Sequence, residues 1–219
     1  DPYVVQDSRE GWVDLMRTVL NSFVGKGYYP SEIDWSQVRP AGSPINGFGG
    51  TASGPGPLQE LVDSITDLLM PKTDQPYKIG STHIVDIFNL IGRCVVAGGV
   101  RRTAEIMFGE PHDDDFRSLK DPSDLNRWSE ELGNLYNEGK GDSPAAQELQ
   151  DKINNHPLRT HRWASNNSVF GTVGMDYSEI SEAIAGNGEP GIIYLDAMRG
   201  YGRMVDPRND RDKRVMGSN

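Results

Sequence analysis

The first segment that could bind a ligand is a glycine- and proline-rich stretch from residue 40 to residue 57. It reads PAGSPINGFGGTASGPGP and contains six glycines. Backbone N–H groups in such a loop, followed by the start of a predicted helix at Leu58, favour an anion such as phosphate. The stretch has neither the GK[ST] ending of a P-loop nor the spacing of a dinucleotide-binding loop. An ordered loop without a ligand is therefore the alternative that the sequence alone favours.

A second candidate is the turn formed by Gly98 and Gly99, which is followed by Arg101 and Arg102. Guanidinium groups suit two-point contacts to phosphate oxygens. A pair of surface arginines at the start of a strand explains the same pattern without a ligand, and it is the simpler interpretation.

The remaining reactive residue types are scattered along the chain. Cys94 lies on the apolar side of a predicted helix, which is typical of a small buried hydrophobic residue rather than of a nucleophile. Three aspartates follow His112 and could hold a cation, but a solvated run of charge explains them better. The run Ser165-Asn166-Asn167-Ser168 places polar groups either at the mouth of a strand or in a turn. We find no metal-ligand motif and expect no metal site.

The candidate residues must be positioned by helices and strands, which are predicted to alternate along the sequence. Asp7 and Glu10 are spaced as a capping box, and apolar residues at steps of three and four continue the helix to Phe23. Helices are also predicted at residues 58–70, 82–95, 123–138, 143–154 and 177–185, and strands at 36–39, 103–108, 161–170 and 191–195. Strands separated by helices indicate an α/β fold with mostly parallel pairing.

Composition excludes several classes of protein. The chain has 219 residues and a net charge of −10, which argues against a nucleic-acid-binding scaffold. One cysteine excludes a disulfide framework within the chain. No apolar run approaches the roughly 20 residues needed to cross a bilayer, so we expect no membrane contact and a cytoplasmic location. The chain begins at Asp1 without a methionine, and we expect it to be a piece of a longer protein.

Six stretches, read together and in order, resemble the catalytic chain of the adenosylcobalamin-dependent (class II) ribonucleotide reductases. Each is weak alone, but their order is specific, and they span most of the chain. The stretches are Asp7–Trp12, Val38–Gly42, Phe48–Pro55, Cys94–Arg102, Arg162–Val169 and Gly188–Gly191.

The resemblance implies a fold and a place within it. The family fold is a ten-stranded α/β barrel with a central finger loop that carries a radical-forming cysteine. Residues 1–219 would form a single partial barrel domain, with effector-site helices and loops 1 and 2 in residues 1–108 and further strands and helices in 109–219. Asn219 would correspond to the asparagine just before the Pro-Cys of the finger loop, where it contacts the substrate ribose. The radical cysteine and the catalytic glutamate are absent from these residues.

The resemblance also implies roles for individual residues. Asp7 and Ser8 match the pair that binds the ribose of an effector deoxynucleotide, and Arg39 matches an arginine that meets the effector phosphate. Loop 1 would span about residues 40–50. Loop 2, which relays effector identity to the substrate, would include Gly98, Gly99, Arg101 and Arg102. Asn166, Asn167 and Ser168 would lie near the substrate.

The function implied is that of a fragment of a ribonucleoside-triphosphate reductase, an oxidoreductase that makes deoxyribonucleotides by cobalamin-initiated thiyl-radical chemistry. This part would carry the allosteric dNTP specificity site and be inactive when isolated. Adenosylcobalamin would bind mainly through residues elsewhere. The partners implied are a ribonucleotide, a dNTP, the other segments of the enzyme and a thioredoxin-type reductant. Two alternatives stay open: a nucleotide-binding module without catalysis, and a fragment of a non-cobalamin reductase.

Overall fold

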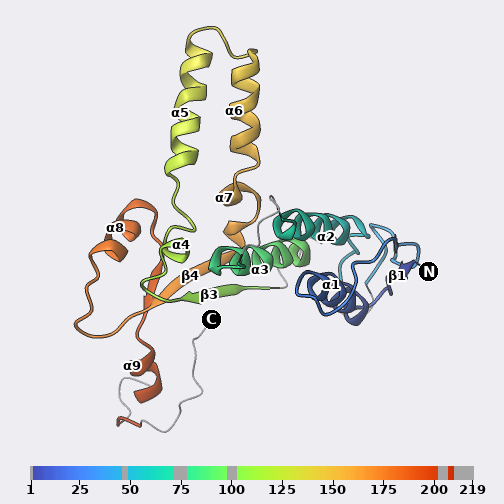
Figure 1. The fold of residues 1–219 in the computed structure, drawn as a ribbon, viewed down its shortest axis with the longest axis horizontal. Helices are drawn as coiled ribbons and strands as arrows, with labels where there is room; N and C mark the ends of the chain where they lie inside the picture. Colours follow the sequence, from blue (N-terminus) through green and yellow to red (C-terminus); the bar gives the residue numbers. More distant parts are fainter. Residues whose placement is uncertain (1, 46–48, 72–77, 98–102, 202–206, 210–219) are drawn as a thin grey trace. The chain divides into compact units, whose positions relative to one another are not determined.

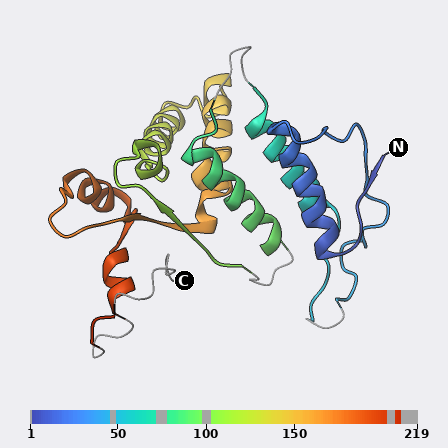
Figure 2. The same cartoon turned by 60° about the horizontal axis from the view of Figure 1, so that its bottom comes forward.

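A computed structural model describes residues 2–45, 49–71, 78–97, 103–201 and 207–209. The chain separates into two compact units (Figures 1 and 2). Unit 1 consists of residues 1–78 and 90–103, and unit 2 of residues 79–89 and 104–219. Helix α3, Ser81–Val96, is shared between them because the division falls between Asn89 and Leu90. The positions predicted for loop 2 (Gly98, Gly99, Arg101 and Arg102) and Asn219 lie outside the described residues.

Unit 1 is built on two helices that pack against each other, α1 (Arg9–Phe23) and α2 (Gly56–Leu69). Their apolar residues recur at three- and four-residue steps, which gives each helix one face to bury. Two short parallel strands, β1 (Tyr3–Val4) and β2 (Ile33–Asp34), complete the unit. The buried side chains of this unit include Val5, Leu15, Val19, Leu58, Val62 and Ile65.

The glycine-rich stretch of unit 1 is an ordered hairpin in its described part. Pro44 and Thr51 pair in an antiparallel bridge, and the N–H of Gly42 donates to the carbonyl of Ala52 at 2.9 Å. Gly54 has a φ of +74°, and a Cβ there would lie 2.8 Å from the backbone nitrogen of Ala41. Only glycine fits this conformation and this approach, so the composition of the stretch reflects its packing.

Unit 2 is organised around a parallel sheet of three strands in the order β3-β4-β5. The strands are β3 (Glu105–Gly109), β4 (Ser165–Phe170) and β5 (Gly191–Ile193), and Glu105 is opposite Ser165 in the register. Short helices α4 (Asp114–Arg117) and α7 (Pro157–Thr160), the helix α8 (Ser178–Asn187) and the final α9 (Leu195–Gly200) connect or follow them. On one face of the sheet, Val169 of β4 forms a core with Val85, Phe116, Leu119 and Ile180.

Between β3 and β4 the chain forms a hairpin of two antiparallel helices that extends away from the sheet (Figure 1). These are α5 (Ser123–Asn137) and α6 (Pro144–Asn154). They share a small core of their own, centred on Leu132, Ala146 and Ile153. Ser143 caps α6 by accepting from the N–H of Ala146.

The α/β class and the parallel pairing are confirmed in the described residues, whereas one predicted strand is wrong. Residues 36–39 form no strand; the strand in this region is β2, which ends at Asp34. The N–H of Ser36 donates to the Asp34 carboxylate at 2.8 Å, and this local turn stops the extended chain. Val38 is nevertheless buried, which explains the misleading apolar signal. The described strands number five in two sheets, so a ten-stranded barrel is not displayed by these residues.

Candidate functional site

Two of the residues predicted to contact an effector meet in unit 1. Nε of Arg39 donates to Oδ2 of Asp7 at 2.6 Å, and the two side chains are 40% and 30% exposed. Asp7 precedes α1 and Arg39 precedes the glycine-rich hairpin, so the pair joins two segments 32 residues apart. This ion pair uses neither Oδ1 of Asp7 nor the terminal amino groups of Arg39, and no described residue binds them, so an acceptor and donors are available to a ligand.

Ser8 has a structural task beside this pair. Its hydroxyl accepts from the N–H of Gly11 at 3.0 Å and caps α1. The predicted capping box is wrong, because Ser8 rather than Asp7 is the N-cap and the third helical position is then Gly11, which has no side chain. Asp7 is directed to Arg39 instead. Gly11 lies tightly against the preceding turn, where a Cβ would be 2.5 Å from the carbonyl oxygen of Gln6.

The hairpin that follows Arg39 offers fewer donors than its composition suggests. The N–H groups of Gly42, Ser43, Ile45 and Ala52 all donate to carbonyl oxygens within residues 40–52. Donors that are satisfied in this way do not bind phosphate without breaking the hairpin. The structure therefore supports the ordered loop rather than a phosphate cradle for this part of the stretch.

The three polar residues predicted near the substrate alternate between the two faces of β4. Asn166 is exposed and Ser168 is half-buried, and both lie on the face opposite the core of unit 2. Asn167 is 3% exposed, and its Oδ1 accepts from the Ser165 hydroxyl on the core side. Asn166 and Ser168 are thus placed together, while Asn167 is a buried structural residue in this chain.

A polar network contacts the backbone at the start of β4. Lys120 donates to the carboxylate of Glu189 at 3.0 Å and to the carbonyl oxygen of Ser165. The other oxygen of Glu189 accepts from the backbone N–H of Asn167 at 3.2 Å. Asn187 donates in turn to the carbonyl oxygen of Lys120 at 2.6 Å. These contacts tie β4 to the segments on both sides of it.

Sequence reasoning missed a second cluster, which is centred on Asp86 in α3. Arg162 donates to both of its carboxylate oxygens, at 2.7 and 2.8 Å, and Nε2 of His161 is 3.0 Å from Oδ1. The Asp86 side chain is only 5% exposed. Burial raises the pKa of Asp86, but the hydrogen bonds from Arg162 and His161 outweigh it, so the pKa lies below its usual value. The one feature of the sequence that could have revealed this cluster is the position of Asp86 among the apolar residues of a predicted helix.

The other candidate residues fit structural roles. Cys94 is 7% exposed, and burial raises the pKa of its thiol to about 11, which does not suit a redox or nucleophilic thiol. Asp113 caps α4 by accepting from the N–H of Phe116 at 3.0 Å. Within the described parts of the chain, no group of His, Cys, Asp and Glu could hold a metal ion, and no helix is long and apolar enough to cross a membrane.

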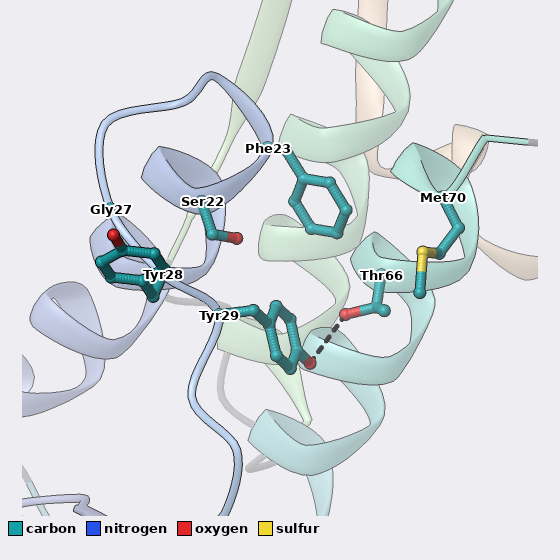
Figure 3. A pocket seen from close by; sticks show the side chains of 7 residues that line it. All are labelled: Ser22, Phe23, Gly27, Tyr28, Tyr29, Thr66 and Met70. Carbon is teal, nitrogen blue, oxygen red and sulfur yellow. Dashed lines mark hydrogen bonds between the residues drawn. The ribbon is translucent and has the colours of Figure 1, made fainter. Parts of the chain in front are cut away.

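An open pocket of about 350 Å³ lies in unit 1, between the end of α1, the connector after it and the end of α2 (Figure 3). Three of its seven lining residues are aromatic. The rings of Phe23 and Tyr29 make an edge-on contact with 6.1 Å between their centroids, and the Tyr29 hydroxyl is 3.0 Å from that of Thr66. The pocket contains none of the residues predicted to bind a ligand.

Comparison with known proteins gives a consistent result. The family model for the insertion domain of B12-dependent ribonucleotide reductase matches residues 2–69, which fall within unit 1. A probable adenosylcobalamin-dependent ribonucleoside-triphosphate reductase of Dictyostelium discoideum is 41% identical over 99% of this chain. Adenosylcobalamin-dependent ribonucleoside-triphosphate reductases of Euglena gracilis and Levilactobacillus brevis are 38% and 36% identical, again over 99% of the chain.

The chain covers 24–25% of the length of these three proteins. No solved structure matches it significantly. The comparisons confirm the resemblance carried by the six sequence stretches, which extends over nearly all of the chain.

Proposed function

We propose that this chain is a segment of an adenosylcobalamin-dependent ribonucleoside-triphosphate reductase, and that it binds the regulatory deoxynucleotide of that enzyme. The observation that carries the proposal is the Asp7–Arg39 ion pair, which joins two separately predicted effector residues within a chain that is similar to such reductases throughout. In the complete enzyme, both units would belong to one ten-stranded barrel domain. The partners would be a ribonucleoside triphosphate, a dNTP, the rest of the polypeptide and a thioredoxin-type reductant.

The chemistry of the pair suits a deoxynucleotide. The carboxylate of Asp7 accepts a hydrogen bond from a ribose 3′-hydroxyl, and the guanidinium of Arg39 binds a phosphate oxygen. Because the pair is partly exposed, its atoms exchange partners at small cost, as a surface ion pair contributes only about 0–1 kcal/mol. Ser8, whose hydroxyl oxygen accepts from Gly11, still has its own hydrogen to donate.

His156, His161 and Cys94 are poorly suited to bind the cobalt of the cofactor. His161 uses both ring nitrogens, toward Thr160 and Asp86, and Nδ1 of His156 accepts from the N–H of Leu158. The only cysteine is buried with a raised pKa. We therefore expect the residues that bind the cofactor to lie outside this segment.

The effector role is tested in the complete reductase by measuring dNTP dissociation constants for Arg39→Gln and Asp7→Asn. Losing a charge-assisted contact costs about 1.5–3 kcal/mol, so we expect affinity to fall by about 10- to 100-fold. Arg17→Gln is the matched control, because Arg17 forms an exposed pair with Asp14 on the same helix at 2.9 Å. Unchanged dNTP affinity in both site variants would refute the effector assignment. Adenosylcobalamin-dependent reduction of ribonucleoside triphosphates by the unaltered enzyme tests the family function separately.

A further inference from the structure

The side chain of Arg162 is held by a closed set of acceptors. Nε and one terminal nitrogen bind the two carboxylate oxygens of Asp86, and the other terminal nitrogen donates to the carbonyl oxygen of Leu119 at 2.7 Å. Its exposed fraction is 15%. This planar fork meets its acceptors in one geometry only, which a lysine does not reproduce.

Arg162 lies immediately before the strand whose residues Asn166 and Ser168 are predicted to lie near the substrate. It begins the 3-10 helix Arg162–Ala164, and β4 starts at the next residue, Ser165. Its partners belong to segments distant in sequence, since Asp86 is in α3 and Leu119 precedes α5. The three contacts therefore fix where the chain enters β4.

The start of β4 decides which side chains face away from the core. Successive residues of a strand point to opposite faces, so a shift of one residue would exchange Asn166 and Ser168 for Ser165 and Asn167. A buried ion pair is a weak source of stability compared with apolar packing, but its directional hydrogen bonds select one arrangement over others. An apolar contact would allow several positions of the chain, whereas the hydrogen bonds of this pair select one register of β4.

We propose that Asp86 and Arg162 are positioning residues for the substrate, because they set β4 so that Asn166 and Ser168 face the ribonucleotide. The inference rests on the proposed function and adds to it a role for a cluster that touches neither effector nor substrate. Lys120 and Glu189 reinforce the same strand farther along, through the carbonyl of Ser165 and the N–H of Asn167.

The test uses the complete reductase with Arg162→Lys, Asp86→Asn and the double variant Asp86→Glu with Arg162→Lys. We measure kcat and KM for a ribonucleoside triphosphate, the dNTP dissociation constant and the midpoint of thermal unfolding. Small misplacements of reacting groups cost up to about 100-fold, so we expect kcat/KM to fall by about 10- to 100-fold in the single variants. In the double variant, the longer side chain of the glutamate compensates for the shorter side chain of the lysine, so the ion pair forms again. We therefore expect the double variant to recover part of the lost kcat/KM.

The matched control is Asp124→Asn with Arg127→Lys, an exposed pair on α5 with a 2.6 Å contact and 58–62% side-chain exposure. We expect this control to keep its kcat/KM, and all folded variants to keep their dNTP affinity. If Asp86→Asn does not fold, Arg162→Lys and the double variant decide the question. Unchanged kcat/KM in the folded variants, or a loss that merely follows the unfolding midpoint without recovery in the double variant, would overturn the inference. Absence of ribonucleotide reduction by the unaltered enzyme would overturn the proposed function and this inference with it.

Discussion

Glu105 gives the chain a pH-dependent stability that a single substitution removes. It is the first residue of β3, on the same strand face as Met107, which packs against the core of unit 2. Its Oε2 is buried and has no hydrogen-bond partner among the described residues, and burial raises the pKa of Glu105 from 4.5 to about 7. The native state therefore keeps a proton that the unfolded chain releases near pH 4.5. Stability falls as the pH rises from that value, and the contribution of the neutral carboxyl is lost through pH 7.

The size of this effect follows from the raised pKa. At 1.36 kcal/mol for each pKa unit, full conversion sets an upper limit of about 3 kcal/mol, and partial access of solvent reduces the expected value to about 1–2 kcal/mol. Glu105→Gln keeps the shape of the neutral acid and cannot ionise. We expect this variant to match the unaltered chain near pH 4.5 and to be more stable by about 1–2 kcal/mol at pH 8.

The assay is urea unfolding of the purified chain, followed by circular dichroism at several pH values between 4.5 and 8. The control is Glu110→Gln, an exposed glutamate just after β3. Subtracting the stability of each variant from that of the unaltered chain at the same pH cancels the other titrating groups. A difference for Glu105→Gln that does not change with pH, or that follows the control, would show that burial does not hold Glu105 in its neutral form.

Two further substitutions test the packing of each unit. Ser8→Ala removes the hydroxyl that accepts from Gly11, and we expect a loss of about 1 kcal/mol in thermal unfolding, with exposed Ser31→Ala as the neutral control. Gly109→Ala places a Cβ 2.3 Å from the ring of the buried Phe116, and we expect a loss of about 1–3 kcal/mol in urea unfolding. Gly133→Ala on α5 meets nothing within 4 Å, so the same change there should stabilise the chain by about 0.5–1 kcal/mol; equal effects at the two glycines would contradict this packing argument.

Local patterns predicted the helices well, because their signals lie within one or two turns. Helices α1, α5 and α6 begin and end within two residues of the predicted bounds. The cap of α1 was misassigned by one position, since Asp7 and Ser8 are both good capping residues. Which of them caps the helix depends on Arg39, which lies 32 residues away in sequence and forms an ion pair with Asp7.

Nonlocal partners also explain what the sequence could not reveal about the site. The resemblance predicted that Asp7 and Arg39 bind an effector, but it did not predict their contact with each other. Asp86 interrupts the apolar residues of α3, which indicates a buried polar group, but its partner lies 76 residues later in the sequence. Asn166, Asn167 and Ser168 were predicted together, and the alternation of β4 separates Asn167 from the other two.

The two arginine–aspartate pairs suit different roles, because they differ in exposure and in how many hydrogen-bonding groups of the arginine already have acceptors. Arg39 and Asp7 meet through one hydrogen bond at a partly exposed position, so solvent or a ligand replaces that contact at little cost. Arg162 and Asp86 are 15% and 5% exposed, and the arginine has three acceptors already in place. Removing either partner there leaves a buried charge, which costs about 3–5 kcal/mol. An exchangeable pair fits a regulatory ligand that comes and goes, whereas a closed pair fits a strand whose register must stay fixed while substrates change.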